Sequence, residues 1–365
     1  MSGLPSGLPP LVSMDEINEH SPLGHRVLHL SRDSRVSDFY ITPGEVLCYR
    51  HNGKLVYDTF VYEPEMAFSF GPGCQDYALS LAGRRFRVSR MMTQGVPRWV
   101  LRLLPERIPD LESIHVPPAS VKAFLESKNG IFLVCGATGS GKSTTIASLI
   151  KARAERRAEH IITFEDPIEY VYPKNLPSLV SQREMGADEL DFATSLRAAL
   201  RQAPDVIVVG EIRDGETAEI ALQAAETGHV VVATLHTSSA AQTVQRYLKL
   251  IPIERMEVAM MSFADSLRAI LCQKLLLDDG KGKRFPIHEL LLRYDSVSAL
   301  IRRGEFKKLD QELEVGHSRG MMSFEKSLQT RIDEGWVPSA AVRQTGFSEH
   351  EVAEYLGREA VLAKE

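Results

Sequence analysis

The sequence predicts an α/β fold whose central parallel sheet has helices on both faces. Between residues 121 and 277, short apolar runs alternate with stretches of helical periodicity, which is the pattern of a parallel sheet with helical crossovers. The runs are apolar throughout, as expected for strands that are buried on both faces. There are four of them, at residues 131–135, 161–164, 206–209 and 230–233.

The first predicted strand leads into a glycine-rich loop of sequence GATGSGKST, and a helical pattern follows that loop. The loop matches G-x-x-x-x-G-K-[ST], and its position between strand and helix distinguishes a phosphate-binding loop from a chance match. Backbone N–H groups of such a loop face the phosphates of a nucleoside triphosphate at a helix N-terminus. The residues expected to bind the nucleotide are Gly136, Ala137, Thr138, Gly139, Ser140, Gly141, Lys142, Ser143 and Thr144.

Polar residues follow the other three predicted strands. The second strand ends in Glu165 and Asp166, the third is followed by Glu211, and the fourth continues to His236. Parallel strands bind ligands at the edge where their carboxyl ends meet. We therefore expect these side chains to lie beside the phosphate-binding loop.

This set of residues suits the transfer of the γ-phosphate to water. Lys142 is expected to reach the β- and γ-phosphates, and Ser143 to offer its hydroxyl to Mg²⁺. Glu211 is the candidate that orients the attacking water or accepts its proton. Glu165 and Asp166 are expected to hold Mg²⁺ through water molecules, because Mg²⁺ keeps several of its own.

Two histidines complete the candidate site. His236 is expected to hydrogen-bond the γ-phosphate, and His229, which immediately precedes the fourth strand, is a further candidate. Taken singly, a histidine near a strand end or a carboxylate in an Asp-Pro turn also fits a structural role. Their shared position at one sheet edge favours the catalytic interpretation.

Composition limits the possible functions. The net charge of −5 and the pI near 6.2 give no broad basic surface, so no direct nucleic-acid binding is expected. No apolar stretch approaches the ~18 residues that cross a bilayer, and no secretion signal is visible, so a cytoplasmic location is expected. The cysteines, Cys48, Cys74, Cys135 and Cys272, are scattered and predict neither a zinc site nor a disulfide framework.

The chain is expected to contain a smaller α+β domain before the core. Asn52 and Gly53 between two β-prone runs predict a hairpin, and residues 85–88 alternate like a half-exposed strand. A helix is expected over residues 216–227, with Gly228 as the glycine that ends it. The expected parts are a flexible tail (1–13), the α+β domain (14–106), a linker (107–120), the core (121–295) and a helical C-terminal region (296–365) with a loop at 309–320.

Arginines that neutralise transition-state charge often come from a neighbouring subunit in enzymes that hydrolyse nucleoside triphosphates. Arg85 and Arg87 share one face of a predicted strand, and Arg98 and Arg102 follow before the linker. Donation across a subunit boundary is consistent with this cluster. A solvated strand that carries surface arginines fits the same spacing.

The four motifs together closely resemble the secretion and type IV pilus motor ATPases, in particular their pilus-retraction (PilT-like) branch. The family's Walker A motif is matched by GATGSGKSTT, its Asp box by ITFEDPIEY, its Walker B region by LRQAPDVIVVGEIRDGET and its His box by TGHVVVATLHT. The motifs occur in the family's order. The similarity extends over roughly residues 80–335.

The resemblance implies a RecA-like P-loop ATPase core, a PAS-like N-terminal domain and the cofactors ATP and Mg²⁺. By resemblance, Glu211 is the Walker B glutamate, Glu165 the Asp-box glutamate, and His229 and His236 the His-box histidines. The trans-acting arginines of the family fall on Arg87, Arg102 and Arg85.

The same resemblance implies a homohexameric ring that works at the base of a pilus. Such a ring is expected to associate with the membrane peripherally, through partners, and to dock on an inner-membrane platform protein at the inner face of the inner membrane. ATP turnover would then drive pilus retraction by pilin disassembly.

Two departures from the family patterns define the alternatives. Residues 296–300 read SVSAL where the retraction branch carries AIRNL, and the four-cysteine zinc motif of the extension branch is absent. The first departure leaves retraction itself open to question, and the second argues against the extension and type II secretion branch. An ATPase that powers a secretion or conjugative transfer apparatus remains open, because such systems recruit members of the same subfamily, as does a slowly hydrolysing accessory retraction paralogue. A small-molecule kinase is disfavoured, because Glu211 and His236 suit water activation and γ-phosphate sensing.

Overall fold

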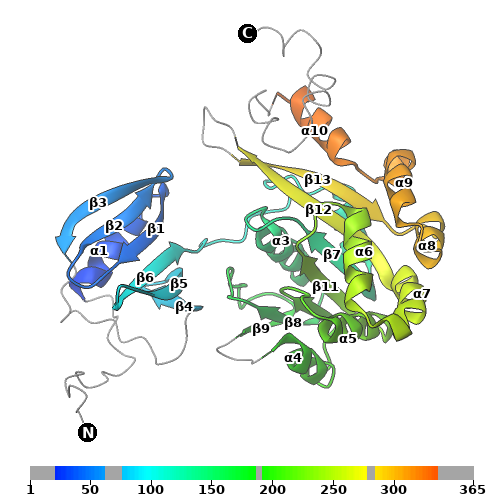
Figure 1. The fold of residues 1–365 in the computed structure, drawn as a ribbon, viewed down its shortest axis with the longest axis horizontal. Coiled ribbons are helices and arrows are strands. Elements are labelled where there is room, and N and C mark those ends of the chain that lie inside the picture. The colour runs from blue at the N-terminus through cyan, green and yellow to red at the C-terminus, as the bar shows by residue number, and fades with distance from the viewer. Residues whose placement is uncertain (1–20, 62–75, 186–190, 278–283, 336–365) are drawn as a thin grey trace. The chain divides into compact units, whose positions relative to one another are not determined.

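The computed structural model describes residues 21–61, 76–185, 191–277 and 284–335 (Figure 1). The chain divides into two compact units, residues 1–106 and residues 107–365, here called the N-terminal and C-terminal units. The expected tail, residues 1–13, and the end of the expected C-terminal region, residues 336–365, lie outside the described residues. None of the helices in the described ranges is long and apolar enough to cross a membrane.

In its described residues, the N-terminal unit is an antiparallel sheet on which helix α1 (Pro22–Ser31) packs. The strand order is β3-β2-β1-β6-β5-β4. The predicted hairpin is confirmed, because Asn52 and Gly53, with φ angles of 48° and 77°, form the turn between β2 and β3. The strands are β1 (Val36–Ile41), β2 (Val46–His51), β3 (Lys54–Val61), β4 (Asp76–Leu81), β5 (Arg84–Thr93) and β6 (Val96–Leu103).

The predicted alternation in residues 85–88 is also confirmed, within strand β5. Phe86 and Val88 are fully buried, whereas Arg85 and Arg87 are partly exposed. The buried side chains pack with Phe39 and the helix residue Val27 in the core of this unit. The arginines therefore lie on the face of the sheet that points away from this core.

The C-terminal unit contains a seven-stranded sheet in the order β13-β12-β7-β11-β10-β8-β9. The four predicted strands are confirmed as β7, β8, β10 and β11, which pair in parallel. Three strands were not predicted: β9 and β12, which extend the parallel sheet, and β13, which pairs antiparallel with β12. The strands are β7 (Gly130–Cys135), β8 (His160–Glu165), β9 (Leu179–Glu184), β10 (Val206–Val209), β11 (Val230–Leu235), β12 (Leu267–Leu277) and β13 (Arg284–Leu292).

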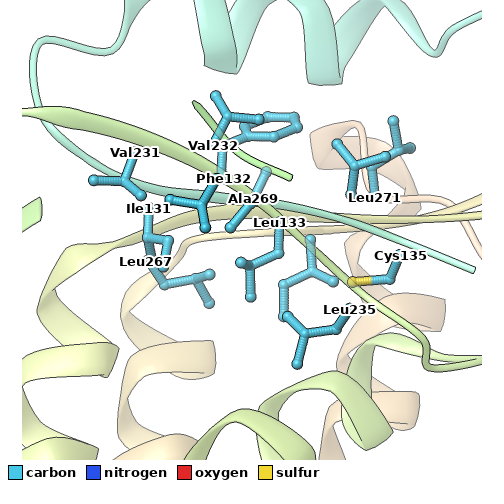
Figure 2. Packing of buried hydrophobic residues seen from close by; sticks show 14 of the residues in the cluster. Ile131, Phe132, Leu133, Cys135, Val231, Val232, Leu235, Leu267, Ala269 and Leu271 are labelled. Carbon is cyan, nitrogen blue, oxygen red and sulfur yellow. The ribbon is translucent and has the colours of Figure 1, made fainter. Parts of the chain in front are cut away.

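The centre of the sheet is the core of this unit. Figure 2 shows side chains of β7, β11 and β12 packed closely together, among them Leu133, Leu235 and Leu271. All six residues of β7 and all six of β11 are buried, as the continuously apolar runs predict for central parallel strands. This rigid centre carries the loops that follow its strands.

The helices of the C-terminal unit precede β7, connect the parallel strands and follow β13. They are α2 (Pro118–Glu126), α3 (Lys142–Ala154), α4 (Phe192–Ala199), α5 (Gly215–Glu226), α6 (Ala240–Leu250), α7 (Met256–Ser266), α8 (Asp295–Arg302), α9 (Leu309–Val315) and α10 (Phe324–Asp333). Residues 107–117 contain no helix or strand, yet Leu111, Ile114 and Val116 pack against the core of this unit.

The predicted end of α5 is confirmed. Gly228 has a φ of +112°, which strongly favours glycine, and the backbone N–H of His229 donates to the carbonyl of Ala224 at 3.1 Å. The expected loop at residues 309–320 is wrong. Leu309 and Leu313, one turn apart, are both buried and form the inner face of α9, and the glycines that suggested a loop lie at the end of this helix and of the short 3-10 turn that follows.

Candidate active site

The carboxyl ends of four neighbouring strands lie at one edge of the sheet. Cys135 pairs with Leu235, so His236 follows β11 beside the start of the phosphate-binding loop. Val209 pairs with Ala233 on one side and with Phe164 on the other. The segments with Glu211 and Glu165 therefore follow next in order along the same edge.

The phosphate-binding loop is shaped by its glycines. The φ angles of Gly136, Gly139 and Gly141 are 147°, 79° and 91°. Residues other than glycine rarely adopt such values. Gly141 is the N-cap of helix α3, whose first residue is Lys142. The loop therefore ends at a helix N-terminus, where backbone N–H groups and the helix dipole favour an anion.

Lys142 points back into the loop. Its Nζ donates to the carbonyl oxygens of Gly136, at 2.8 Å, and Ala137, at 3.0 Å. Burial lowers the pKa of the Lys142 ammonium, and the negative charge of Glu211 opposes that shift. The side chain of Ser143 is exposed, so its hydroxyl is available to a metal ion.

Glu211 lies in contact with two basic side chains. Arg213 donates from Nε to Glu211 Oε2 at 2.8 Å, and His236 Nε2 lies 3.4 Å from Oε1. Burial acts to raise the pKa of Glu211, but the hydrogen bond and charge of Arg213, together with His236, outweigh burial and hold this pKa below its usual value. Glu211 is therefore a carboxylate at neutral pH, as a proton acceptor must be.

The backbone around Glu211 is fixed by both neighbouring strands. The N–H of Gly210 donates to the carbonyl of Phe164 at 2.8 Å, and that of Ile212 to the carbonyl of Thr234 at 3.0 Å. The hydroxyl of Thr234 donates to the carbonyl of Gly210. Glu211 thus extends from a rigid turn rather than from a free loop.

The two acidic residues after β8 have different surroundings. Glu165 Oε1 accepts hydrogen bonds from Thr163 Oγ1, at 2.7 Å, and from Gln182 Nε2, at 2.9 Å. The side chain of Asp166 is exposed. The Ser143 hydroxyl and the Asp166 carboxylate are both exposed, and oxygen donors of these kinds are the ligands that Mg²⁺ accepts while it retains water.

His229 lies away from this site within the chain. It precedes Val230, which pairs with Gly130 at the start of β7, whereas the phosphate-binding loop follows the other end of β7. A six-residue strand separates the two edges by roughly 16–20 Å. The His229 Nδ1 instead lies 3.0 Å from the carbonyl of Ala224, at the end of α5.

The three candidate arginines belong to the N-terminal unit. Arg87 on β5 and Arg102 on β6 are direct cross-strand neighbours. Arg85 lies two residues before Arg87 and on the same face of β5. The Nε of Arg102 donates to Asp38 Oδ1 at 2.8 Å.

Sequence reasoning missed a buried glutamine behind the phosphate-binding loop. Gln273 on β12 is only 4% exposed, and its carboxamide accepts from Thr145 Oγ1 at 2.7 Å and donates to the carbonyl of Ser140 at 2.6 Å. A Cβ atom at Gly136 would lie 2.4 Å from the carbonyl oxygen of Gln273, and one at Gly141 2.7 Å from its Nε2. The loop is thus held against β12 by one side chain and close backbone packing.

Replacing Gln273 by leucine is expected to weaken nucleotide binding. The leucine side chain has a similar volume but leaves the Ser140 carbonyl and the Thr145 hydroxyl without a partner. Two lost hydrogen bonds of about 1 kcal/mol each correspond to a rise in the Kd for ADP of roughly tenfold or more. A titration with a fluorescent ADP analogue measures this effect.

The matched control is Gln329→Leu, which removes a partly exposed glutamine of α10 that bonds Asp333. It should leave the Kd unchanged. A Gln273→Leu protein that binds ADP as tightly as the control would show that the amide does not support the loop.

A glycine-rich loop between strand and helix, on a mostly parallel sheet with carboxylates and a histidine beside it, defines a P-loop nucleotide-binding protein. The model of the type II/IV secretion system protein family matches residues 75–319. The chain belongs to this family.

Individual relatives agree with this assignment. The Uncharacterized protein YggR of Escherichia coli (strain K12) is 39% identical over 322 residues, which is 85% of this chain and 98% of that relative. The Twitching motility protein of Neisseria gonorrhoeae is 42% identical over 267 residues, 73% of this chain and 71% of that relative. The crystal structure of the pilus retraction motor PilT with bound ADP matches with a TM-score of 0.80 and 32% identity, over 89% of this chain and 97% of that chain. The predicted family and the predicted α/β fold are confirmed.

Proposed function

We propose that this chain is an ATPase that drives the retraction of a type IV pilus by pilin disassembly. The observation that carries the proposal is the contact between Glu211 and His236 at the sheet edge that also holds the phosphate-binding loop. A carboxylate and an imidazole beside the phosphates suit hydrolysis by water. The names of two relatives, a twitching motility protein and a pilus retraction motor, support pilus retraction as the function that ATP hydrolysis drives.

In this proposal each side chain of the edge has one task. Lys142 leaves its loop carbonyls to neutralise the β- and γ-phosphates, and Glu211 orients the attacking water and accepts its proton. His236 hydrogen-bonds the γ-phosphate. Ser143 would hold Mg²⁺ with Glu165 and Asp166 acting through water, and the ion would supply charge neutralisation at the phosphates.

We further propose that the active form is a homohexamer in which Arg87 and Arg102, with Arg85, act on the nucleotide of a neighbouring subunit. An arginine supplied in trans stabilises the charge of the transition state and raises kcat by a factor of ~10³–10⁵. The exposed position of Arg102, whose side chain is 67% accessible, supports this role. The ring would dock on an inner-membrane platform protein at the cytoplasmic face of the membrane.

A second candidate is an ATPase that powers a secretion or conjugative transfer apparatus. The observation that favours it is the sequence of residues 296–300, SVSAL, which lies within α8 and differs from the AIRNL of the retraction branch. Both candidates share the same hydrolytic site, so only a cellular assay separates them.

Deletion of the gene from a piliated strain is expected to give hyperpiliated cells that do not twitch, because assembly continues without withdrawal. Electron microscopy and a twitching assay measure this, with wild-type and Lys142→Ala genes returned as the positive and negative controls. Cells without pili would mean that the motor assembles pili instead. Normal pili with lost substrate transfer would support the second candidate.

A further inference from the structure

Four charged residues form one row across the N-terminal sheet. Asp38 on β1 pairs directly with Arg50 on β2 and with Arg102 on β6, and Arg102 pairs with Arg87 on β5. Directly paired residues of adjacent strands lie on the same face of a sheet. The row therefore runs Arg50, Asp38, Arg102, Arg87, with one carboxylate among three guanidinium groups.

Asp38 is the buried member of this row. It is 4% exposed, and its Oδ1 accepts from the Nε of Arg102 at 2.8 Å. Its Oδ2 accepts from the hydroxyl of Ser37 at 2.6 Å and lies 3.8 Å from the Nε of Arg50. The Asp38 carboxylate is therefore fixed by burial and by its neighbours, so its position does not change when the side chain of Arg102 moves.

The hydrogen bond to Asp38 uses Nε of Arg102, the guanidinium nitrogen attached to the aliphatic part of the side chain. Among the residues that the structure describes, Asp38 is the hydrogen-bond partner of the Arg102 guanidinium. Two-thirds of the Arg102 side chain stays accessible to solvent. The two terminal nitrogens, which make the paired contacts to a phosphate, are left available. A free arginine samples many rotamers, and a charge-assisted bond at Nε removes much of this freedom before any anion arrives.

We propose that Asp38 is a positioning residue that presents Arg102 to the γ-phosphate of ATP in a neighbouring subunit. The inference rests on the proposed trans action of Arg102 and adds the group that orients it. Asp38 touches no nucleotide itself. Its contribution is preorganisation, so it acts on the transition state through Arg102 and has little influence on the binding of ATP to the phosphate-binding loop.

The test compares the ATPase kinetics of the full-length ring in four forms: wild type, Asp38→Asn, Arg102→Ala and the double variant. Asparagine keeps the shape of Asp38 but loses its charge. We expect Asp38→Asn to lower kcat about tenfold or more, since a small misplacement of a catalytic group costs up to ~10²-fold, with KM for ATP within twofold of wild type. The double variant should match Arg102→Ala, because the two residues act as one unit.

Asp58→Asn is the matched control. Asp58 accepts from the Nε of Arg26 at 2.6 Å in the same unit and is similarly buried. Its loss should lower the melting temperature while kcat stays unchanged. If Asp38→Asn proves unstable, Arg102→Lys replaces it. Lysine keeps the positive charge, but its single nitrogen cannot bond Asp38 and also offer two further nitrogens to a phosphate. We therefore expect a similar fall in kcat.

The outcomes separate the inference from the proposed function. Mixed rings of Arg102→Ala and Glu211→Gln subunits should recover activity if Arg102 acts in trans. Recovery in the mixed rings, together with Asp38→Asn at wild-type kcat or with multiplicative losses in the double variant, would overturn the role of Asp38 alone. Full activity of Arg102→Ala would overturn both proposals.

Discussion

Lys142→Ala is expected to weaken the binding of ATP and ADP strongly. The ammonium of Lys142 is the positive side chain within the phosphate-binding loop, and its two carbonyl contacts also tie the side chain to Gly136 and Ala137. Truncating one partner of a desolvated charge pair costs about 2–5 kcal/mol, which raises Kd by roughly 30-fold to several thousandfold. Isothermal titration calorimetry measures this change directly.

Lys151→Ala is the control for this experiment. Lys151 lies on the same helix, α3, and pairs with Asp110 and Glu155 instead of facing the loop. This variant should bind nucleotide as the wild type does. A Kd for Lys142→Ala within a few-fold of the control would place the nucleotide elsewhere.

Glu211→Gln is expected to bind ATP and to stop its turnover. Glutamine keeps the size of the side chain and can still accept a hydrogen bond from Arg213, but it cannot take a proton from water. Loss of a general base lowers kcat by ~10²–10⁴-fold, while the phosphate-binding loop and its affinity remain. Steady-state ATPase assays together with filter binding of labelled ATP distinguish the two effects.

Glu216→Gln is the matched surface control, because Glu216 is an exposed residue of α5 that pairs with Arg197. It should hydrolyse ATP at the wild-type rate. Equal hydrolysis by Glu211→Gln would remove Glu211 from its proposed role. Loss of hydrolysis in vitro with normal twitching in cells would instead indicate the accessory paralogue, for which turnover is dispensable.

The central strands were predictable because burial on both faces leaves a continuous apolar run in the sequence. Strand β12 was not, since α7 ends at Ser266 and β12 begins at Leu267 with no turn residue between them. The sequence also gives no local sign of the pairing between β12 and β13, which depends on contacts across the sheet. Apolar runs and turn-forming residues therefore predicted the central strands of the sheet but not the strands at its edges.

The same reasoning explains which site residues were found. Glu211 and His236 follow strand ends, so the topology of a parallel sheet was enough to bring them together. His229 precedes its strand and so lies at the opposite edge. Gln273 and Asp38 make their hydrogen bonds with residues more than 60 positions away, and no spacing in the sequence encodes such partners.

The strand behind the phosphate-binding loop also belongs to a ribbon that reaches the last helices. Gln273 pairs with His288 across β12 and β13, and the His288 N–H donates to the hydroxyl of Ser327 on α10 at 3.0 Å. Leu290 exchanges two backbone hydrogen bonds with Met322, at 2.7 and 3.1 Å. The phosphate-binding loop is therefore connected to α10 through the Gln273 carboxamide, the pairing of β12 with β13 and the Ser327 hydroxyl. These contacts link the nucleotide-binding edge of the sheet to the helices that follow β13.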